Sequence, residues 1–585
     1  MQTCASIVCL FLVASAASSV VAQPAPAIQL KQLIDDAWQF RLREAPTFAT
    51  RFGDHRYDDR LADESLANQQ QRAETKRKFL ARWQAIPRNP LARPDQINYD
   101  IFGRLLQEEL AEYDFGMHLI PLTNRWGFHI WFPELPQQIP LESVADYENY
   151  ISRLRAFSKY TDDHIELMRA GIDQQLVLPS VVLEGYHDSI TTHIVDDPAG
   201  SLLATPLRTF PERIPDSVRR RLSDSVKQAI TDSVVPSYRR LLLFMDQEYL
   251  PACRGSIAAS ALPNGREFYR HRVRRFTTLD LTPDEVHQTG QTEVRRIRQE
   301  MDAIIEKVGF KGDFAEFVQY LRDEPRFYAE TPEQLQKEIA FVLKRMDGQL
   351  PRLFHTLPRT PYGIREVPEY IAPKTTTAYY QPPPGDLSQA GFYYINTYNL
   401  KARPLYGIVA LSLHEAVPGH HLQIALQQEL SDIPPFRRFA GITAFIEGWA
   451  LYAERLGLEV GFYEDPYRDF GRLTYEMWRA CRLVVDTGMH YFGWTRKQAI
   501  DFMAENSALS LHNIESEVDR YISWPGQALA YKTGELKIRQ LRNHAERELG
   551  NAFDVREFHD VVLGSGAVPL LVLEDNVNAY IAEMK

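Results

Sequence analysis

The run from Leu413 to His421, Leu-His-Glu-Ala-Val-Pro-Gly-His-His, constrains this chain more than any other feature. In a zinc-hydrolase helix of the H-E-x-x-H type, two histidines one turn apart face one metal ion, and the glutamate beside the first polarises a water molecule. Here Pro418 occupies the fifth position, and the next histidines are His420 and His421. Proline removes a helical hydrogen bond and glycine tolerates unusual dihedrals. We therefore expect a distorted helix that returns one of these two histidines to His414.

A candidate third ligand follows in the segment Phe445–Glu454, whose pattern indicates a helix. Glu447 and Glu454 share one face of this helix, but at 1.5 Å rise per residue they lie about 10 Å apart along its axis. Only one of them can therefore contact a metal ion held by the histidines. We expect Glu447, because Gly448 beside it permits the close approach of another helix.

These residues together predict a zinc site. The expected ligands of Zn²⁺ are His414, either His420 or His421, and Glu447, while Glu415 is the expected general base that takes a proton from water. The alternative is a set of buried core histidines held by hydrogen bonds. Three histidines and one glutamate within eight residues, followed by a suitable carboxylate, favour the metal site.

Most of the chain has the pattern of amphipathic helix. It has 585 residues and is 44% hydrophobic, enough for a large buried core. Apolar residues at three- and four-residue spacing predict long helices at Gln29–Leu42, Val144–Met168 and Val218–Leu250. The sequence therefore predicts a mainly α fold.

One segment departs from this pattern. Residues 358–399 are rich in tyrosine, proline and glycine, which favours short strands around a turn. We expect a small β-sheet at about 360–399, next to the helix that carries His414. An N-terminal helical part, 23–270, and a C-terminal catalytic part, 271–585, are predicted, and the two could pack as one body.

Residues 1–22 have the features of a signal peptide. The stretch Ala5–Ala22 carries no charged side chain and ends in Val-Val-Ala, a pattern typical of signal-peptidase cleavage. A membrane anchor is the alternative, but serines dilute the apolar run and Pro24 and Pro26 follow at once. We predict a periplasmic or secreted protein that starts at Gln23 and has no membrane contact after cleavage.

Cysteine content and charge exclude further classes. Only Cys253 and Cys481 lie outside the leader, so this is not a disulfide-built scaffold; one bridge and two free thiols both remain open. The net charge of −11 argues against nucleic acid as a partner, because nucleic-acid binding normally needs a basic face.

The motif resembles a known family. The run 414–421 with Glu447-Gly448-Trp449-Ala450, and the blocks 479–490 and 525–534, are similar to the bacterial family of unknown function 885 (DUF885). The resemblance covers most of the chain and places it near the gluzincin-type zinc metallopeptidases of the thermolysin-like clan. It implies a large helical metallopeptidase-like fold with a deep channel between helical halves.

Clan relatives use tyrosine and histidine near the tetrahedral intermediate, so the resemblance nominates Tyr531 and His490 as catalytic residues. Asp486 stands one helical turn before His490 and could orient its imidazole toward substrate. A buried Asp–His pair that ties helices together is the alternative. The turn Pro525-Gly526-Gln527 could bring Tyr531 over the site.

Two further features predict substrate contacts. Arg479 and Arg482, three residues apart on one predicted helix, could bind a substrate carboxylate in the bidentate manner of arginine. An exposed charged face is the alternative for at least one of them. The aromatic strand Phe392–Ile395, with Tyr394, could lie along an extended peptide as edge strands do, although ordinary strand packing explains the same residues.

The sequence therefore predicts a secreted or periplasmic zinc-dependent hydrolase, foremost a metallopeptidase acting on a peptide or small acyl substrate. Two alternatives remain open. The same activated water could attack esters or amides that are not peptides, or the chain could be an interaction protein that retains an enzyme fold without catalysis.

Overall fold

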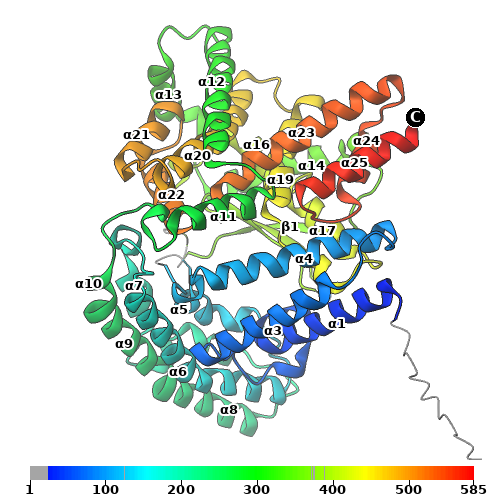
Figure 1. The fold of residues 1–585 in the computed structure, drawn as a ribbon. Coiled ribbons are helices and arrows are strands. Elements are labelled where there is room, and N and C mark those ends of the chain that lie inside the picture. Colours follow the sequence, from blue (N-terminus) through cyan, green and yellow to red (C-terminus); the bar gives the residue numbers. More distant parts are fainter. Residues whose placement is uncertain (1–23, 124–125, 370–371, 373–375, 386, 388) are drawn as a thin grey trace, which may run out of the picture.

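The protein is mainly α-helical with one three-stranded sheet, which confirms the predicted fold class (Figure 1). The structure, a computed structural model, describes residues 24–585 except 124–125, 370–371, 373–375, 386 and 388. The predicted signal peptide, 1–22, lies outside the described residues. No helix within the described part of the chain is long and apolar enough to cross a membrane.

The N-terminal helices form the lower part of the molecule in Figure 1. Helices α1 (Pro26–Glu44), α3 (Leu66–Gln84) and α4 (Arg93–Asp114) pack together, and α6 (Val144–Asp173) lies against α8 (Asp216–Ala229) and α9 (Val235–Phe244). The stretch expected as one helix at 218–250 is helical throughout. Short π-helical segments join α8 to α9 and α9 to α10 (Leu250–Ala252), so the prediction holds with two local irregularities.

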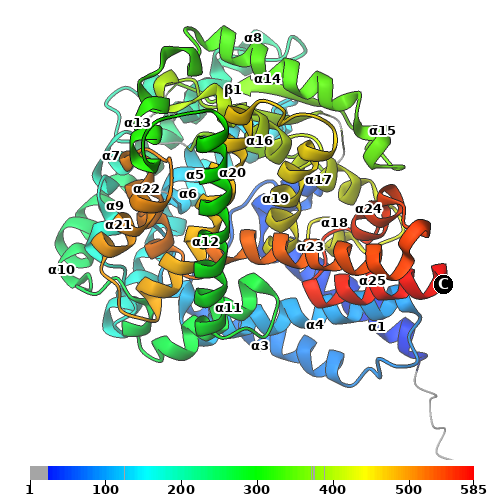
Figure 2. The ribbon, with the colours of Figure 1, turned by 90° about the horizontal axis from the view of Figure 1, so that it is seen from above.

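Two pairs of helices organise the C-terminal part. Helix α12 (Pro283–Lys307) runs alongside α20 (Pro466–His490), as Figure 2 shows, and α19 (Thr443–Glu459) packs on α23 (Ala530–Leu549). Helix α16 (Leu405–Glu415) contacts both α19 and α20. The remaining helices are α2 (Pro46–Phe52), α5 (Phe128–Trp131), α7 (Tyr186–Thr191), α11 (Gly265–Thr277), α13 (Phe314–Asp323), α14 (Pro332–Asp347), α15 (Leu350–Leu353), α17 (His420–Glu429), α18 (Pro435–Arg438), α21 (Arg496–Asn506), α22 (Leu511–Ser523), α24 (Val555–Leu563) and α25 (Leu570–Met584).

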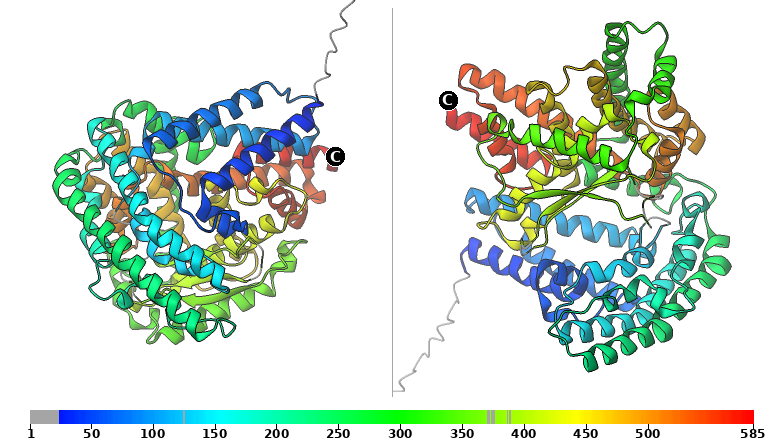
Figure 3. Two further views of the ribbon diagram at one scale, coloured as in Figure 1. Left: turned by 90° about the horizontal axis from the view of Figure 1, so that it is seen from below. Right: turned by 180° about the vertical axis from the view of Figure 1, so that it is seen from behind.

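The small sheet lies in the predicted place. Its strands β1 (Tyr362–Glu366), β2 (Ala378–Gln381) and β3 (Gly391–Ile395) have the order β1-β3-β2, with β3 parallel to β1 and antiparallel to β2. Seen from behind, the strands occupy the middle of the molecule, between the N-terminal helices and the upper C-terminal ones (Figure 3). Strand β2 contacts α16, so the sheet adjoins the helix that carries His414.

This topology corrects the prediction for the aromatic strand. Strand β3 is central, and its backbone pairs with strands on both sides, so it has no open edge to receive an extended peptide. Tyr394 stacks on Tyr379 of the neighbouring β2, with ring centroids 4.9 Å apart. Ordinary strand packing therefore accounts for Tyr394.

The hydrophobic core is built from both the N-terminal and the C-terminal parts of the chain. Both large hydrophobic clusters take residues from either side of residue 270. Leu106 and Phe445 belong to one cluster, and Tyr238 and Val484 belong to the other. The sequence left open whether Cys253 and Cys481 form a disulfide. In the structure both are free thiols; Cys481 is buried and Cys253 is half-buried. The channel implied by the family resemblance stays a prediction.

Candidate metal centre

The helix carrying the motif is interrupted as the proline and glycine predicted. Helix α16 ends at Glu415 and α17 begins at His420. A Cβ on Gly419 would lie 1.9 Å from the carbonyl oxygen of His414, so only glycine permits the chain to fold back here. The indole N–H of Trp449 donates a hydrogen bond to the carbonyl of Pro418 at 2.9 Å, which fixes the loop to α19.

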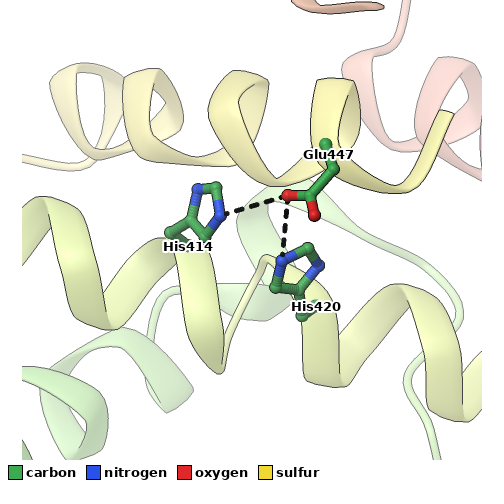
Figure 4. Close-up of side chains that lie close together, drawn as sticks. All are labelled: His414, His420 and Glu447. Carbon is green, nitrogen blue, oxygen red and sulfur yellow. Dashed lines mark ion pairs between the residues drawn. The ribbon is translucent and has the colours of Figure 1, made fainter. Parts of the chain in front are cut away.

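This interruption brings His414 and His420 together opposite Glu447 (Figure 4). Glu447 Oε2 lies 3.6 Å from Nε2 of His414 and 3.4 Å from Nε2 of His420. The possible ligand atoms of the three residues all lie within 4.8 Å of one another. Four ligands at about 2.0–2.1 Å from a tetrahedral Zn²⁺ would be about 3.3 Å apart, so the separations from Glu447 suit a zinc ion.

Glu454 determines which nitrogen of His414 faces this cluster. Its Oε1 lies 2.8 Å from His414 Nδ1. A carboxylate accepts, so Nδ1 carries a hydrogen and Nε2 is the nitrogen that faces Glu447. Glu454 is 1% exposed, and Arg479 Nη2 lies 3.6 Å from the same carboxylate oxygen. The sequence placed Glu454 on the correct helix face, but its orienting role depends on contacts between helices that spacing alone does not reveal.

The electrostatics of the cluster match its geometry. Burial would lower the pKa of His414, but the hydrogen bonds that the ring donates to Glu447 and Glu454 outweigh burial and raise the pKa to about 9. Burial would raise the pKa of Glu447, but the adjacent His420 and His414 hold it well below its usual range. Nδ1 of His420 is buried without a hydrogen-bond partner among the described residues. The cluster therefore favours a positive charge at its centre, supplied by either protons or a cation.

His421, left open as an alternative ligand, points elsewhere. Its Nδ1 lies 2.9 Å from the hydroxyl of Tyr380 on β2, and its ring packs against Tyr362 on β1. Burial lowers the pKa of His421 to about 4, so the ring is neutral. His421 connects α17 to the sheet, whereas His420 belongs to the cluster.

Glu415 stands next to His414 and is 8% exposed. Its carboxylate forms no hydrogen bond or ion pair with any other side chain in the described part of the protein. Burial, and then the charge of Glu415, raise the pKa of Tyr393 well above its usual value. Glu415 is thus a buried carboxylate that directly follows the ligand candidate His414 in the chain and has no partner among the described side chains.

Tyr531 lies on α23, which crosses α19 closely. A Cβ on Gly448 would lie 2.5 Å from the backbone of Gly534, and a Cβ on Gly534 would lie 1.9 Å from the carbonyl oxygen of Ala444. The two glycines therefore let α19 and α23 approach closely, as expected for Gly448. Burial raises the pKa of Tyr531, and the negative charge of Glu447 adds to this rise, so the phenol feels the charge of one member of the cluster.

The prediction that Asp486 orients His490 is wrong, because each side chain has other partners. The amide of Ala259 donates to Nδ1 of His490 at 3.1 Å, and Nε2 lies 3.0 Å from the carbonyl of Tyr521. His490 is fully buried and both ring nitrogens are occupied by backbone groups, so it cannot contact substrate in this arrangement.

Asp486 instead accepts hydrogen bonds from the Tyr269 hydroxyl at 2.6 Å and from the Gly526 amide at 3.1 Å. Helical spacing placed Asp486 and His490 on one face correctly. That helix face packs against several other elements, and each of the two side chains forms its hydrogen bonds with those elements instead of with the other.

Arg479 and Arg482 fit neither sequence-based interpretation, a site for a substrate carboxylate or an exposed charged face. Arg479 and Arg482 are buried, 4% and 3% exposed, rather than lying on a charged surface. Arg479 turns toward Glu454, and Arg482 Nη2 binds Glu517 at 3.1 Å. The guanidinium of Arg482 also stacks 4.3 Å from the ring centroid of Tyr531. These contacts make the arginines internal supports of the site instead of an open carboxylate receptor.

The fold and the site define a large, mainly helical protein with a centre of two buried histidines and one half-buried glutamate. A family model described as a bacterial protein of unknown function, DUF885, matches residues 46–577. The chain belongs to this family, which confirms the resemblance seen in the motif. No curated protein matches the chain.

Solved structures agree with this assignment. A candidate lipoprotein from Colwellia psychrerythraea is 30% identical, with a TM-score of 0.91, over 96% of this chain and 100% of its own. A candidate lipoprotein of unknown function from Shewanella oneidensis is 18% identical, with a TM-score of 0.66, over 94% of this chain and 99% of its own, and shares the fold.

Proposed function

We propose that this protein is a zinc-dependent hydrolase, foremost a peptidase, in which His414, His420 and Glu447 hold the metal and Glu415 is the general base. The observation that carries the proposal is the convergence of two imidazole nitrogens on one carboxylate oxygen. The residue after His414, Glu415, adds a buried carboxylate that has no partner among the described side chains. A core histidine pair would not need the unpaired Glu415.

The donor set fits zinc. Two imidazoles and one carboxylate are the ligand set of catalytic zinc sites that keep a fourth position for water. When bound, Zn²⁺ lowers the pKa of such a water to about 7 and polarises a carbonyl group.

The chain's own residues supply the remaining functions. Glu454 holds the His414 ring so that Nε2 faces the ligand cluster. Glu415 takes the proton from the attacking water and delivers it to the leaving group. Tyr531 donates a hydrogen bond to the substrate oxygen on which negative charge develops.

The substrate and the location are part of the proposal. Peptides are the first candidates because the motif resembles gluzincin peptidases, and small acyl esters or amides use the same chemistry. Two solved relatives are described as candidate lipoproteins, which supports an exported protein, periplasmic or secreted. The leader-like residues 1–22 support the same conclusion.

The test is a comparison of wild type with Glu415→Gln. Both proteins are purified without chelator, their zinc content is measured, and both are screened against quenched-fluorescence peptide libraries and ester and amide libraries. Glu415→Gln should keep about one zinc per chain and lose about 10²- to 10⁴-fold in kcat. Normal turnover in this variant, or a wild type that contains no metal after zinc loading, would overturn the proposal.

A further inference from the structure

A chain of hydrogen-bonded polar side chains extends from the hydroxyl of Tyr531 through Gln527 and Arg520 to Glu517. Gln527 Nε2 lies 3.4 Å from the Tyr531 hydroxyl, and Arg520 Nη1 donates to Gln527 Oε1 at 2.7 Å. Arg520 in turn holds Glu517 through Nε at 3.2 Å and Nη2 at 2.9 Å. Gln527 is 5% exposed and Glu517 is 3% exposed, so the chain is an internal structure and not a surface contact.

The chemistry of these groups fixes the direction of every hydrogen bond. Guanidinium has donors only, so Arg520 must face the oxygen of the Gln527 amide. The amide nitrogen therefore faces Tyr531 and donates to the phenol oxygen. The phenol hydrogen is left free, because no other side chain among the described residues takes a hydrogen bond from Tyr531.

The phenol ring is held from a second side. The Arg482 guanidinium stacks on it at 4.3 Å, and Arg482 also binds Glu517, the carboxylate that anchors Arg520. Glu517 thus ties together both arginines that act on Tyr531. The arrangement fixes the ring and leaves its hydroxyl hydrogen directed away from its protein partner.

We propose that Gln527, with its amide oriented by Arg520, is a positioning residue that makes Tyr531 an obligatory hydrogen-bond donor to the substrate. This inference rests on the proposed function, since the acceptor is the negative oxygen that forms during hydrolysis. Such a donor stabilises the transition state more than the bound substrate, so its loss lowers kcat and leaves KM nearly unchanged.

The decisive variants are Gln527→Glu and Gln527→Met, which have similar size and opposite effects on the phenol. A carboxylate at 527 still binds Arg520 but accepts the phenol hydrogen, which turns Tyr531 away from substrate. A methionine leaves the hydrogen free. Gln527→Glu should lower kcat at least tenfold with KM within threefold of wild type, whereas Gln527→Met should lower kcat less than fivefold.

A double-mutant cycle separates this effect from simple charge repulsion. In the Tyr531→Phe background, Gln527→Glu should change kcat less than twofold, because the group through which it acts is gone. Equal losses in Gln527→Glu and Gln527→Met, or a full tenfold loss in the Tyr531→Phe background, would overturn the inference.

The same cycle can be measured without turnover. Phenylphosphonate is a tetrahedral anion that can accept the phenol hydrogen, and its affinity for the zinc-loaded protein is measured by calorimetry. Gln527→Glu should weaken binding at least tenfold, but less than threefold in the Tyr531→Phe background; equal weakening in both would contradict the assignment. A wild type that hydrolyses nothing removes the proposed function, and in this case the binding cycle alone decides the role of Gln527.

Discussion

The Oε1 atom of Glu454 lies 2.8 Å from Nδ1 of His414, although the two residues come from different helices. Glu454 stands two turns after Glu447 on α19, so one helix supplies both a predicted metal ligand and the group that orients another ligand. The loop between α16 and α17 is tied to the same helix through Trp449. Helix α19 is therefore the scaffold on which the interrupted motif is assembled.

Glu454→Ala should weaken zinc binding about 10- to 100-fold, because His414 loses the acceptor that fixes its tautomer and ring orientation. Zinc affinity is measured by competition with a chromophoric chelator. The matched control is Glu459→Ala on the same helix, since Glu459 binds Arg542 and lies outside the cluster. Comparable zinc affinities in the two variants would refute the orienting role.

Adjacent histidines provide a second test of the site. His420→Gln should abolish stoichiometric zinc binding, because it removes one of the two imidazole nitrogens that face Glu447. His421→Gln should bind zinc but lower the melting temperature, because it disturbs the contacts of α17 with Tyr380 and Tyr362. Metal analysis and thermal unfolding of both variants check this. Zinc loss in His421→Gln with retention in His420→Gln would reverse the assignment.

The sequence predicted much of this structure where local rules decide. Periodicity found the long helices, and the aromatic, glycine-rich segment found the sheet. Pro418 and Gly419 correctly indicated an interrupted helix, because a Cβ at 419 cannot fit beside His414. The choice between His420 and His421 could not be made, since it depends on the direction in which α17 leaves the loop.

The residues of α20 mark the limit of such reasoning. Helical spacing put Asp486 and His490 on one face, but a face that is buried on all sides offers many partners. Asp486 forms hydrogen bonds with Tyr269 and Gly526. His490 forms hydrogen bonds with backbone groups of Ala259 and Tyr521. Pairing within one helix is a sound expectation for exposed faces, where neighbours from other helices do not compete.

The close crossing of α19 and α23 predicts an effect on stability. Gly534→Ala would place a Cβ 1.9 Å from the carbonyl oxygen of Ala444, so the helices must separate. The expected cost is about 1–3 kcal/mol, with a lower melting temperature and weaker zinc binding, because Glu447 moves with α19. Gly441→Ala is the matched control, since a Cβ there meets no atom within 4 Å. A Gly534→Ala protein as stable as the control would show that the crossing tolerates a side chain.

The buried imidazole of His490 makes stability depend on pH. Burial lowers the pKa of His490 to about 3, against an ordinary value of 6.5. The neutral ring therefore favours the folded state above pH 6.5, and this stabilisation is lost as the pH falls from 6.5 toward 3, where only the unfolded chain binds the proton. Below pH 6.5 the contribution falls by about 1.4 kcal/mol for each pH unit. His490→Gln removes the titrating ring, so the difference in unfolding free energy between wild type and variant should shrink by about 2 kcal/mol between pH 6.5 and 5. Denaturant unfolding at a series of pH values measures this difference. A constant difference across that range would mean that burial does not keep His490 neutral in the folded state.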